Sequence, residues 1–133
     1  MTYVKSNGES FAGEAAVAAM QADYALFTDF FHEPTYGTVA SNPDGSSYRL
    51  IGYAKMFVNL PAGAGGGGEK KYTDLQGRGW ECQAQGAFIF DVVKDPAGPQ
   101  GLRIKFFQMF ADPTPILGEA IKRGIIPVEA LTS

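Results

Sequence analysis

The chain has 133 residues, of which 45% are hydrophobic and 19% charged, and its formal net charge is −3. This length fits one domain over residues 1–133, and the composition is that of a globular protein rather than a disordered one. The charges are mixed in sign and form no basic stripe, so we expect no nucleic-acid partner. No apolar run is long enough to cross a bilayer, so we expect no membrane partner.

Cysteine and histidine each occur once, at Cys82 and His32. A lone cysteine has no partner for an internal disulfide, which favours a reducing compartment. The first residues, Met1–Ser6, are polar and unlike a signal peptide, so we expect a cytoplasmic protein. One imidazole and one thiol exclude most zinc sites built from protein ligands alone, and we expect no metal.

The first predicted element is an amphipathic helix from about Ser10 to Phe31. Its apolar stripe follows helical spacing at Ala16, Met20, Tyr24, Phe27 and Phe31. We expect the helix to stop at His32–Glu33, because Pro34 disfavours helical geometry in the residue before it. A stripe so rich in aromatic side chains needs a broad apolar surface, and a sheet would supply one.

The middle of the chain predicts strands joined by turns. The predicted strands cover about residues 35–41, 47–60, 79–93 and 102–111. Residues 42–45 read Asn-Pro-Asp-Gly, a combination typical of a turn. Long strands connected in this way indicate an antiparallel meander. Glycines such as Gly86 predict bulges or bends that curl the sheet.

A short C-terminal helix completes the predicted fold. Thr114 can cap its start, Pro115 suits the first helical position, and Gly124 suits a left-handed stop. We expect the apolar segment 125–128 to pack on the body of the protein or on a partner chain. The predicted class is α+β: a strongly curved antiparallel sheet forming a cone, packed on a long helix, with a short C-terminal helix.

The segment Gly63–Gly68 matches the pattern GxGxxG. A dinucleotide-binding fingerprint opens a helix, whose N-terminus receives the pyrophosphate. Here no apolar helical stripe follows, and the next long element is a strand. We therefore interpret the segment as a mobile hairpin loop and expect no cofactor.

Two side chains are candidates for proton transfer. His32 has an unperturbed pKa near neutrality and suits a general base or acid. The sequence shows no partner for it, which favours a structural residue that meets the negative end of a helix. Asp112 ends the last strand, where burial at the rim of an apolar pocket would raise its pKa. It can equally begin a turn ahead of the C-terminal helix.

Aromatic side chains are the strongest signal in the sequence. A plain hydrophobic core explains most of them, but the polar atoms of tyrosine and tryptophan need partners inside a protein. Methionine also suits adaptable apolar pockets. The candidate ligand-binding residues are Tyr24, Trp80, Met56, Phe88 and Phe107. Glu81 and Asp91 lie on the other side of their strand, and we expect them to face solvent or a partner.

Two segments and the strands between them resemble a known family. The segments are Gly8–Ala15 (GESFAGEA) and Phe107–Pro113 (FQMFADP). With the long paired strands they resemble the nuclear transport factor 2-like superfamily, in particular its SnoaL-like branch. The resemblance implies a cone-shaped bent sheet with helices at its mouth, and a homodimer or higher homo-oligomer.

The resemblance also implies a function. Enzymes of this superfamily are cofactor-free isomerases, cyclases and dehydratases, which implies acid–base chemistry on a small, apolar, oxygenated organic molecule. Asp112 would carry the proton, His32 would be its partner, and Tyr53 or Trp80 would hydrogen-bond an oxygen of the ligand. The alternative is a noncatalytic ligand-binding or dimerisation module.

The start of the chain departs from this pattern. Members of the superfamily usually begin with two helices that cover the cone, whereas this chain starts near the first strand. We therefore expect either a trimmed form or a wall supplied by a partner subunit.

Overall fold

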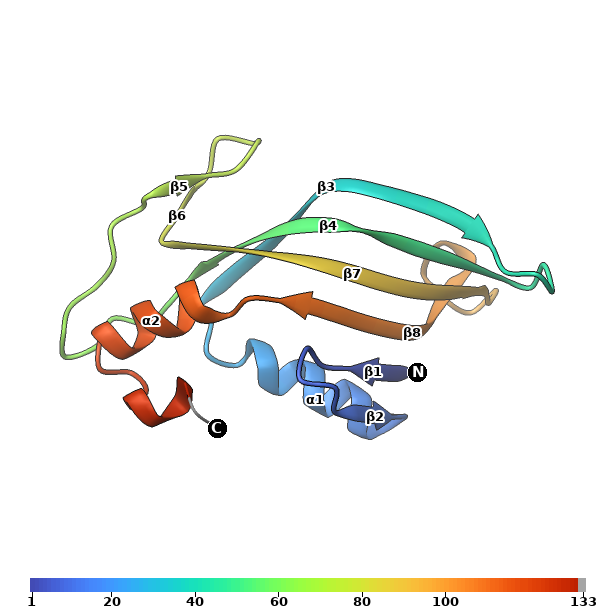
Figure 1. The fold of residues 1–133 in the computed structure, drawn as a ribbon. Coiled ribbons are helices and arrows are strands. Elements are labelled where there is room, and N and C mark those ends of the chain that lie inside the picture. The colour runs from blue at the N-terminus through green and yellow to red at the C-terminus, as the bar shows by residue number, and fades with distance from the viewer. Residues whose placement is uncertain (132–133) are drawn as a thin grey trace. The chain divides into compact units, whose positions relative to one another are not determined.

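The computed structural model describes residues 1–131, and it describes the side chains of residues 1–129. Within this range a six-stranded sheet has the strand order β2-β1-β8-β7-β4-β3 (Figure 1). Its strands are β1 (Thr2–Val4), β2 (Ser10–Ala12), β3 (Asp29–Ser41), β4 (Ser47–Asn59), β7 (Cys82–Lys94) and β8 (Leu102–Ala111). Strands β2 and β3 are its edges, so this sheet is not closed.

The remaining elements are a short hairpin and the helices. Strands β5 (Tyr72–Thr73) and β6 (Gly79–Trp80) pair in a separate two-stranded sheet. The helices are α1 (Glu14–Tyr24), α2 (Thr114–Lys122) and the 3₁₀ turns η1 (Pro99–Gly101) and η2 (Val128–Leu131). The predicted α+β class, with a sheet packed on a helix and a short C-terminal helix, is confirmed. None of the described helices is long and apolar enough to span a bilayer.

The chain divides into two compact units. Unit 1 comprises Met1–Asp23, Pro34–Ala54 and Gly86–Phe110, and unit 2 comprises Tyr24–Glu33, Lys55–Gln85 and Ala111–Ser133. Strands β3, β4, β7 and β8 contribute residues to both units. Each unit has its own cluster of buried apolar side chains.

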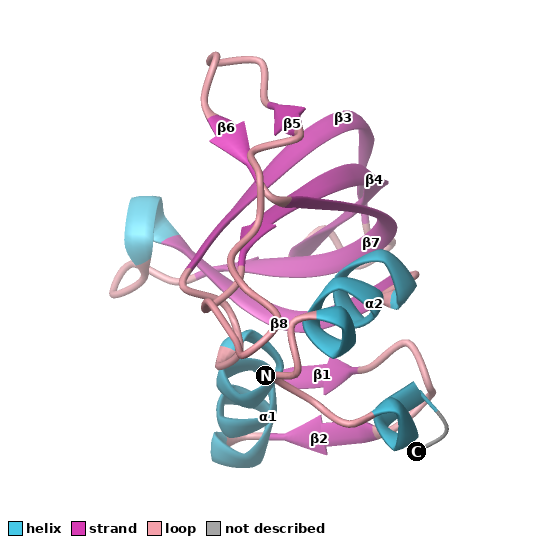
Figure 2. Ribbon diagram, turned by 90° about the vertical axis from the view of Figure 1, so that its left-hand side faces the viewer, coloured by secondary structure: helices cyan, strands magenta, loops and turns pink. Residues whose placement is uncertain are grey.

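In unit 1, α1 lies beside β1 and β2 (Figure 2). Ala16 and Ala19 are one helical turn apart, and they pack in one cluster with Tyr3 and Phe107. The ring of Tyr3 stacks on Phe107 at 5.3 Å between centroids, and Phe107 stacks on Phe90 at 4.5 Å. β1 and β8 run parallel, with Tyr3 opposite Phe107, so the sheet is mixed rather than wholly antiparallel.

In unit 2, β4, β7 and α2 supply the core. Its buried members are Val58, Leu60, Cys82, Ala84, Ile116 and Ala120. Helix α2 is followed by Gly124, which has a φ of +75° and whose amide donates a hydrogen bond to the Ile121 carbonyl at 2.9 Å. These features form the predicted left-handed stop. The amide of Ile125 then bonds the carbonyl of Ala120 at 3.0 Å. Ile125 and Ile126 pack on the core, as predicted for this segment.

The first helix is shorter than predicted. It ends at Tyr24 rather than near Phe31, and β3 already begins at Asp29. The amide of Thr28 donates to the carbonyl of Asn59 at 2.9 Å, which ties the chain to the end of β4. Aromatic residues also favour strands, and here sheet pairing prevails over helical periodicity. His32 therefore lies in a strand, and its placement at a helix C-terminus was wrong.

Candidate functional site

The candidate site is formed where α1 ends and β3 begins. Tyr24 is the last residue of α1, and His32 is the fourth residue of β3. Side chains alternate along a strand, so Phe30 and His32 share one side of β3 while Phe31 and Glu33 share the other. The turn between α1 and β3 thus brings two predicted site residues, Tyr24 and His32, together.

Tyr24 and His32 form a hydrogen-bonded pair. The Tyr24 Oη lies 3.0 Å from the His32 Nε2, and either atom can donate, according to the tautomer of the imidazole. The Phe30 ring lies 4.7 Å from the Tyr24 ring and 5.8 Å from the imidazole, between centroids. Phe27 makes an edge contact with Tyr24 at 5.8 Å. The polar pair therefore lies among aromatic rings.

The environment of His32 keeps its imidazole neutral. Burial lowers the pKa of His32 from its ordinary value of 6.5, because the charged form loses hydration. In the described part of the chain, no carboxylate or cationic side chain forms an ion pair with the imidazole. A neutral imidazole has one donor and one acceptor nitrogen, which suits it to pass a proton in either direction.

Asp112 has a different environment from the one predicted. Its side chain is exposed, and its Oδ1 accepts the Thr114 amide at 3.0 Å, at the start of α2. Hydrogen bonds from the side chain and backbone of Thr114 lower the pKa of Asp112, so the predicted rise was wrong. Within residues 1–129, Asp112 makes no hydrogen bond to His32. The turn-and-helix interpretation of this residue matches its contacts.

Apart from Tyr24, the predicted ligand-binding residues of unit 2 lie in its core or pack on it. Trp80 is 2% exposed, and its Nε1 donates to Asp74 Oδ2 at 2.9 Å. Its ring stacks against Phe31 and Phe57. Met56 is partly buried and packs on the core of unit 2. The polar atom of Trp80 thus has a partner within the protein.

Three predicted site residues lie in unit 1. Phe107 is buried and Phe88 packs against the same core cluster. Tyr53 is 60% exposed, and its ring lies 6.1 Å from that of Tyr36. The ligand-binding and oxygen-stabilising roles of these residues stay predictions.

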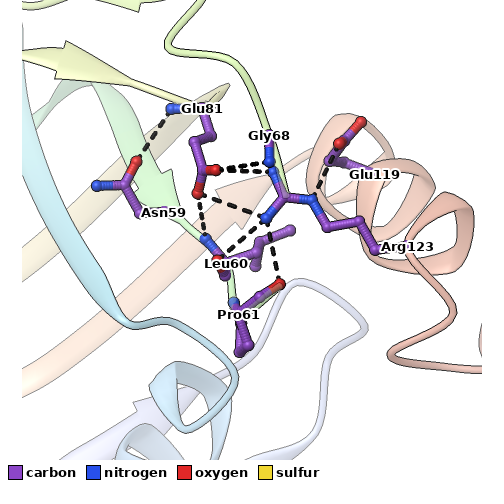
Figure 3. Close-up of polar contacts among 7 residues, drawn as sticks. All are labelled: Asn59, Leu60, Pro61, Gly68, Glu81, Glu119 and Arg123. Atoms are coloured by element: carbon purple, nitrogen blue, oxygen red, sulfur yellow. Dashed lines mark hydrogen bonds and ion pairs between the residues drawn. The ribbon is translucent and has the colours of Figure 1, made fainter. Parts of the chain in front are cut away.

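A buried ion-pair cluster around Arg123 was missed in the sequence (Figure 3). The Arg123 Nη2 lies 3.0 Å from Glu81 Oε2, with side chains only 2% and 9% exposed, and the Arg123 Nε donates to Glu119. Glu81 was expected to face solvent or a partner, and it is instead held inside unit 2 by Arg123. Burial raises the pKa of Glu81, but the bonds from Arg123 and the Leu60 amide outweigh it and lower that pKa.

The glycine-rich segment packs on this cluster. The Gly65 amide donates to the Arg123 carbonyl at 3.0 Å, and the Gly68 amide donates to Glu81 Oε2 at 3.1 Å. A Cβ atom at Gly63 or Gly68 would collide with Arg123. The segment is a loop, as predicted, but it packs closely on Arg123, whereas a mobile hairpin was expected. Its glycines fit this close packing.

Residues 1–129 contain no group of three or more His, Cys, Asp or Glu side chains that could hold a metal ion. The candidate site contains the Tyr24 hydroxyl and the His32 imidazole, which are hydrogen-bonded to each other. Together they can exchange a proton with a bound molecule.

Comparison with known proteins gives structural matches only. No family model and no curated protein matches the sequence. Among solved structures, LinA superposes with a TM-score of 0.52 at 11% identity, over 84% of this chain and 64% of the LinA chain. The chain thus spans less than two thirds of the length of LinA. This likeness is one of fold, and it confirms the predicted resemblance at that level.

Two further structures are similar at lower scores. AclR, a candidate hydroxylase from Streptomyces galilaeus, gives a TM-score of 0.47 at 10% identity, over 99% of this chain and 73% of that one. A candidate polyketide cyclase from Xanthomonas campestris pv. campestris gives 0.44 at 15% identity, over 92% and 75%.

Proposed function

We propose that this chain, which has a nuclear transport factor 2-like fold of the SnoaL type, is a cofactor-independent enzyme acting by proton transfer. Its substrate class is a small, mainly apolar, oxygen-bearing organic molecule. The observation that carries the proposal is the Tyr24–His32 pair, with Oη and Nε2 3.0 Å apart among aromatic rings. This combination places a neutral base beside a weak acid in partly desolvated surroundings.

The pair can work as a two-way proton relay. When the Tyr24 hydroxyl donates to Nε2, the imidazole takes up that proton as Oη accepts one from the substrate. The reverse transfer returns a proton to another atom of the substrate and restores both side chains. Such general acid–base catalysis contributes about 10²- to 10⁴-fold to a rate, and a pKa near the working pH favours it. Isomerisation, cyclisation and dehydration all require steps of this kind.

The surroundings of the pair favour an apolar substrate. Phe30 contacts both Tyr24 and His32, yet its side chain remains 46% exposed. Phe27 makes an edge contact with Tyr24 and lies 6.5 Å from Phe30, between ring centroids. An apolar molecule that covers the exposed part of Phe30 would strengthen the pair electrostatically by removing water from it.

The proposal changes the roles assigned from the sequence. His32 and Tyr24 carry the proton, whereas Asp112 is left out because it is exposed and bonded to the Thr114 amide. Tyr53 as an oxygen-stabilising donor remains a proposal for unit 1.

Deuterium exchange tests the proposal without knowledge of the natural substrate. The protein is incubated in D₂O near neutral pD with a panel of small apolar 1,3-diketones and aryl ketones, and loss of the proton next to the carbonyl is followed by NMR. We expect wild-type protein to accelerate exchange of at least one compound. His32→Gln should reduce this acceleration by about 10²-fold or more. Tyr24→Phe should reduce it too, while Tyr72→Phe, which removes a more exposed hydroxyl of unit 2, should not.

Two results would reject the proposal. If His32→Gln catalysed exchange as fast as the wild-type protein, the imidazole would have no part in the mechanism. If Asp112→Asn lost exchange and His32→Gln retained it, the proton-transferring residue would be Asp112 and not His32.

A noncatalytic module is the second candidate, and one surface of unit 1 favours it. Three apolar side chains on the same face of β3 and β4 are well exposed: Tyr36 (60%), Ile51 (48%) and Tyr53 (60%). Exposed apolar groups of this kind suit contact with another molecule. Such a module would shift the NMR signals of Tyr36 and Tyr53 on binding a ketone from the panel, without accelerating exchange of any of the ketones.

A further inference from the structure

The two residues that flank His32 are both held by the β5–β6 hairpin. The hairpin runs from Tyr72 to Trp80. Phe31 and Glu33 lie on the side of β3 opposite to His32, since side chains alternate along a strand. Each makes a specific contact with the hairpin, and all of these residues belong to unit 2.

Glu33 makes the polar contact. Its side chain is 7% exposed, and its Oε1 accepts the Leu75 amide at 2.8 Å. A carboxylate at such a depth is costly unless it is hydrogen-bonded, so this bond is specified by the fold rather than incidental. It connects the turn of the hairpin to the residue directly after His32.

Phe31 makes the apolar contact. The guanidinium carbon of Arg78 lies 4.3 Å from the centroid of the Phe31 ring, within cation–π distance. Trp80 stacks on the same ring at 6.4 Å with an interplanar angle of 14°. The residue directly before His32 is therefore in contact with two side chains of the hairpin.

Asp74 holds the hairpin in the shape that makes these contacts. Its Oδ1 accepts the amides of Gln76 and Arg78, and its Oδ2 accepts the Arg78 Nε and the Trp80 Nε1. Burial raises the pKa of Asp74, but these bonds outweigh it and lower that pKa, so the carboxylate is charged near neutral pH. Gly77 has a φ of +83°, which closes the turn.

We infer that Glu33 and Phe31 are positioning residues for His32. The hairpin holds β3 immediately before and after His32, and this fixes the backbone from which the imidazole reaches the Tyr24 Oη. A displacement of about 1 Å in such a pair can cost about 100-fold in rate. The consequence for turnover rests on the proposed function, whereas the consequence for the geometry of His32 does not.

Glu33→Ala tests the polar half of this inference. The variant removes the acceptor of the Leu75 amide, and we expect the ¹⁵N NMR signal of the His32 Nε2 to shift and exchange of the ketone probes to fall tenfold or more. Glu33→Gln keeps an oxygen at the acceptor position and should restore both readouts. Leu75→Ala is the matched control, because its side chain is 88% exposed and its backbone amide is retained.

Arg78→Met tests the apolar half, and it decides the question if Glu33→Ala does not fold. Its side chain is 48% exposed, so a substitution there is tolerated better than one at Glu33. We expect the His32 Nε2 signal to shift in Arg78→Met, because this variant loses the contact with Phe31 and the bond to Asp74 that holds the hairpin. Far-ultraviolet circular dichroism checks that each variant is folded.

The outcomes separate this inference from the proposed function. An unchanged His32 signal in folded Glu33→Ala and Arg78→Met would overturn the positioning role, even where wild-type protein catalyses exchange. A shifted signal with no exchange by wild-type protein would support the positioning role and count against the enzyme.

Discussion

The two units differ in where they place their charges. The ion pairs of unit 1, such as Arg103–Asp95 with side chains 55% and 31% exposed, lie at its surface, above an aromatic core. Unit 2 instead buries Arg123, Glu81 and Asp74. Unit 1 buries neutral polar groups such as the Tyr3 hydroxyl, whereas unit 2 also buries charged groups, and each of these must meet its partner.

This difference accounts for the position of the candidate site. Among residues 1–129, no buried side-chain nitrogen or oxygen atom lacks a hydrogen-bond partner. In unit 2, the hydrogen bonds that satisfy these buried atoms hold the glycine-rich loop, the β5–β6 hairpin and the start of β3 in place. A pair of atoms that must stay about 3 Å apart for proton transfer is best supported by such a network.

The largest expected effect is on the Arg123 cluster. Arg123→Met leaves the Glu81 carboxylate buried without its guanidinium, so we expect a loss of about 3–5 kcal/mol in the free energy of unfolding. Urea denaturation at pH 7 measures it. Arg103→Met, at a surface pair of unit 1, is the control. Equal losses in the two variants would contradict the distinction between the units.

A smaller effect is expected at the loop that covers this cluster. Gly68→Ala places a Cβ atom against the Arg123 guanidinium, and we expect it to lower the free energy of unfolding by about 1–3 kcal/mol. Gly67→Ala is the matched control, because its Cβ would meet nothing closer than Ala62 at 4.0 Å. Similar urea midpoints for the two variants would show that the loop is not packed as described.

The sequence predicts much of this architecture because strand and turn signals are local. The last strand, 102–111, has the predicted bounds, and β4 ends one residue earlier than expected. His32 was misplaced because aromatic residues fit both the helical stripe and the strand, and the bond from Thr28 to Asn59 decides between them. Such tertiary contacts leave no local signature.

The Arg123–Glu81 pair was missed for the same reason. Its members are 42 residues apart, and nothing in either segment shows that they meet. One part of the cluster was visible, since Glu119 and Arg123 have the i, i+4 spacing of a helical ion pair.

The pH dependence of the free energy of unfolding tests whether the pKa of His32 is lowered. Its pKa is lowered in the folded protein, so the unfolded chain binds more protons as the pH falls below about 6.5. The free energy of unfolding should then decrease by at most about 1.4 kcal/mol per pH unit, down to the folded pKa. His32→Gln should flatten this slope just below pH 6.5. An unaltered slope would show that His32 is not buried.

The smallest expected effect concerns the surface pair of unit 1. Arg103→Met should change the free energy of unfolding by less than about 1 kcal/mol, because exposed ion pairs are screened by water and salt. Added salt should diminish even this difference. A loss of about 3 kcal/mol or more would make the surface pair as important as the buried one.

Titration of the one imidazole by ¹⁵N NMR tests the central claim most directly, because every histidine signal then comes from His32. We predict a pKa below 6.5, a neutral ring at pH 7, and a shift of the Nε2 signal in Tyr24→Phe that leaves the Nδ1 signal nearly unchanged. A pKa at or above 6.5, with an Nε2 signal indifferent to the loss of the Tyr24 hydroxyl, would contradict the account.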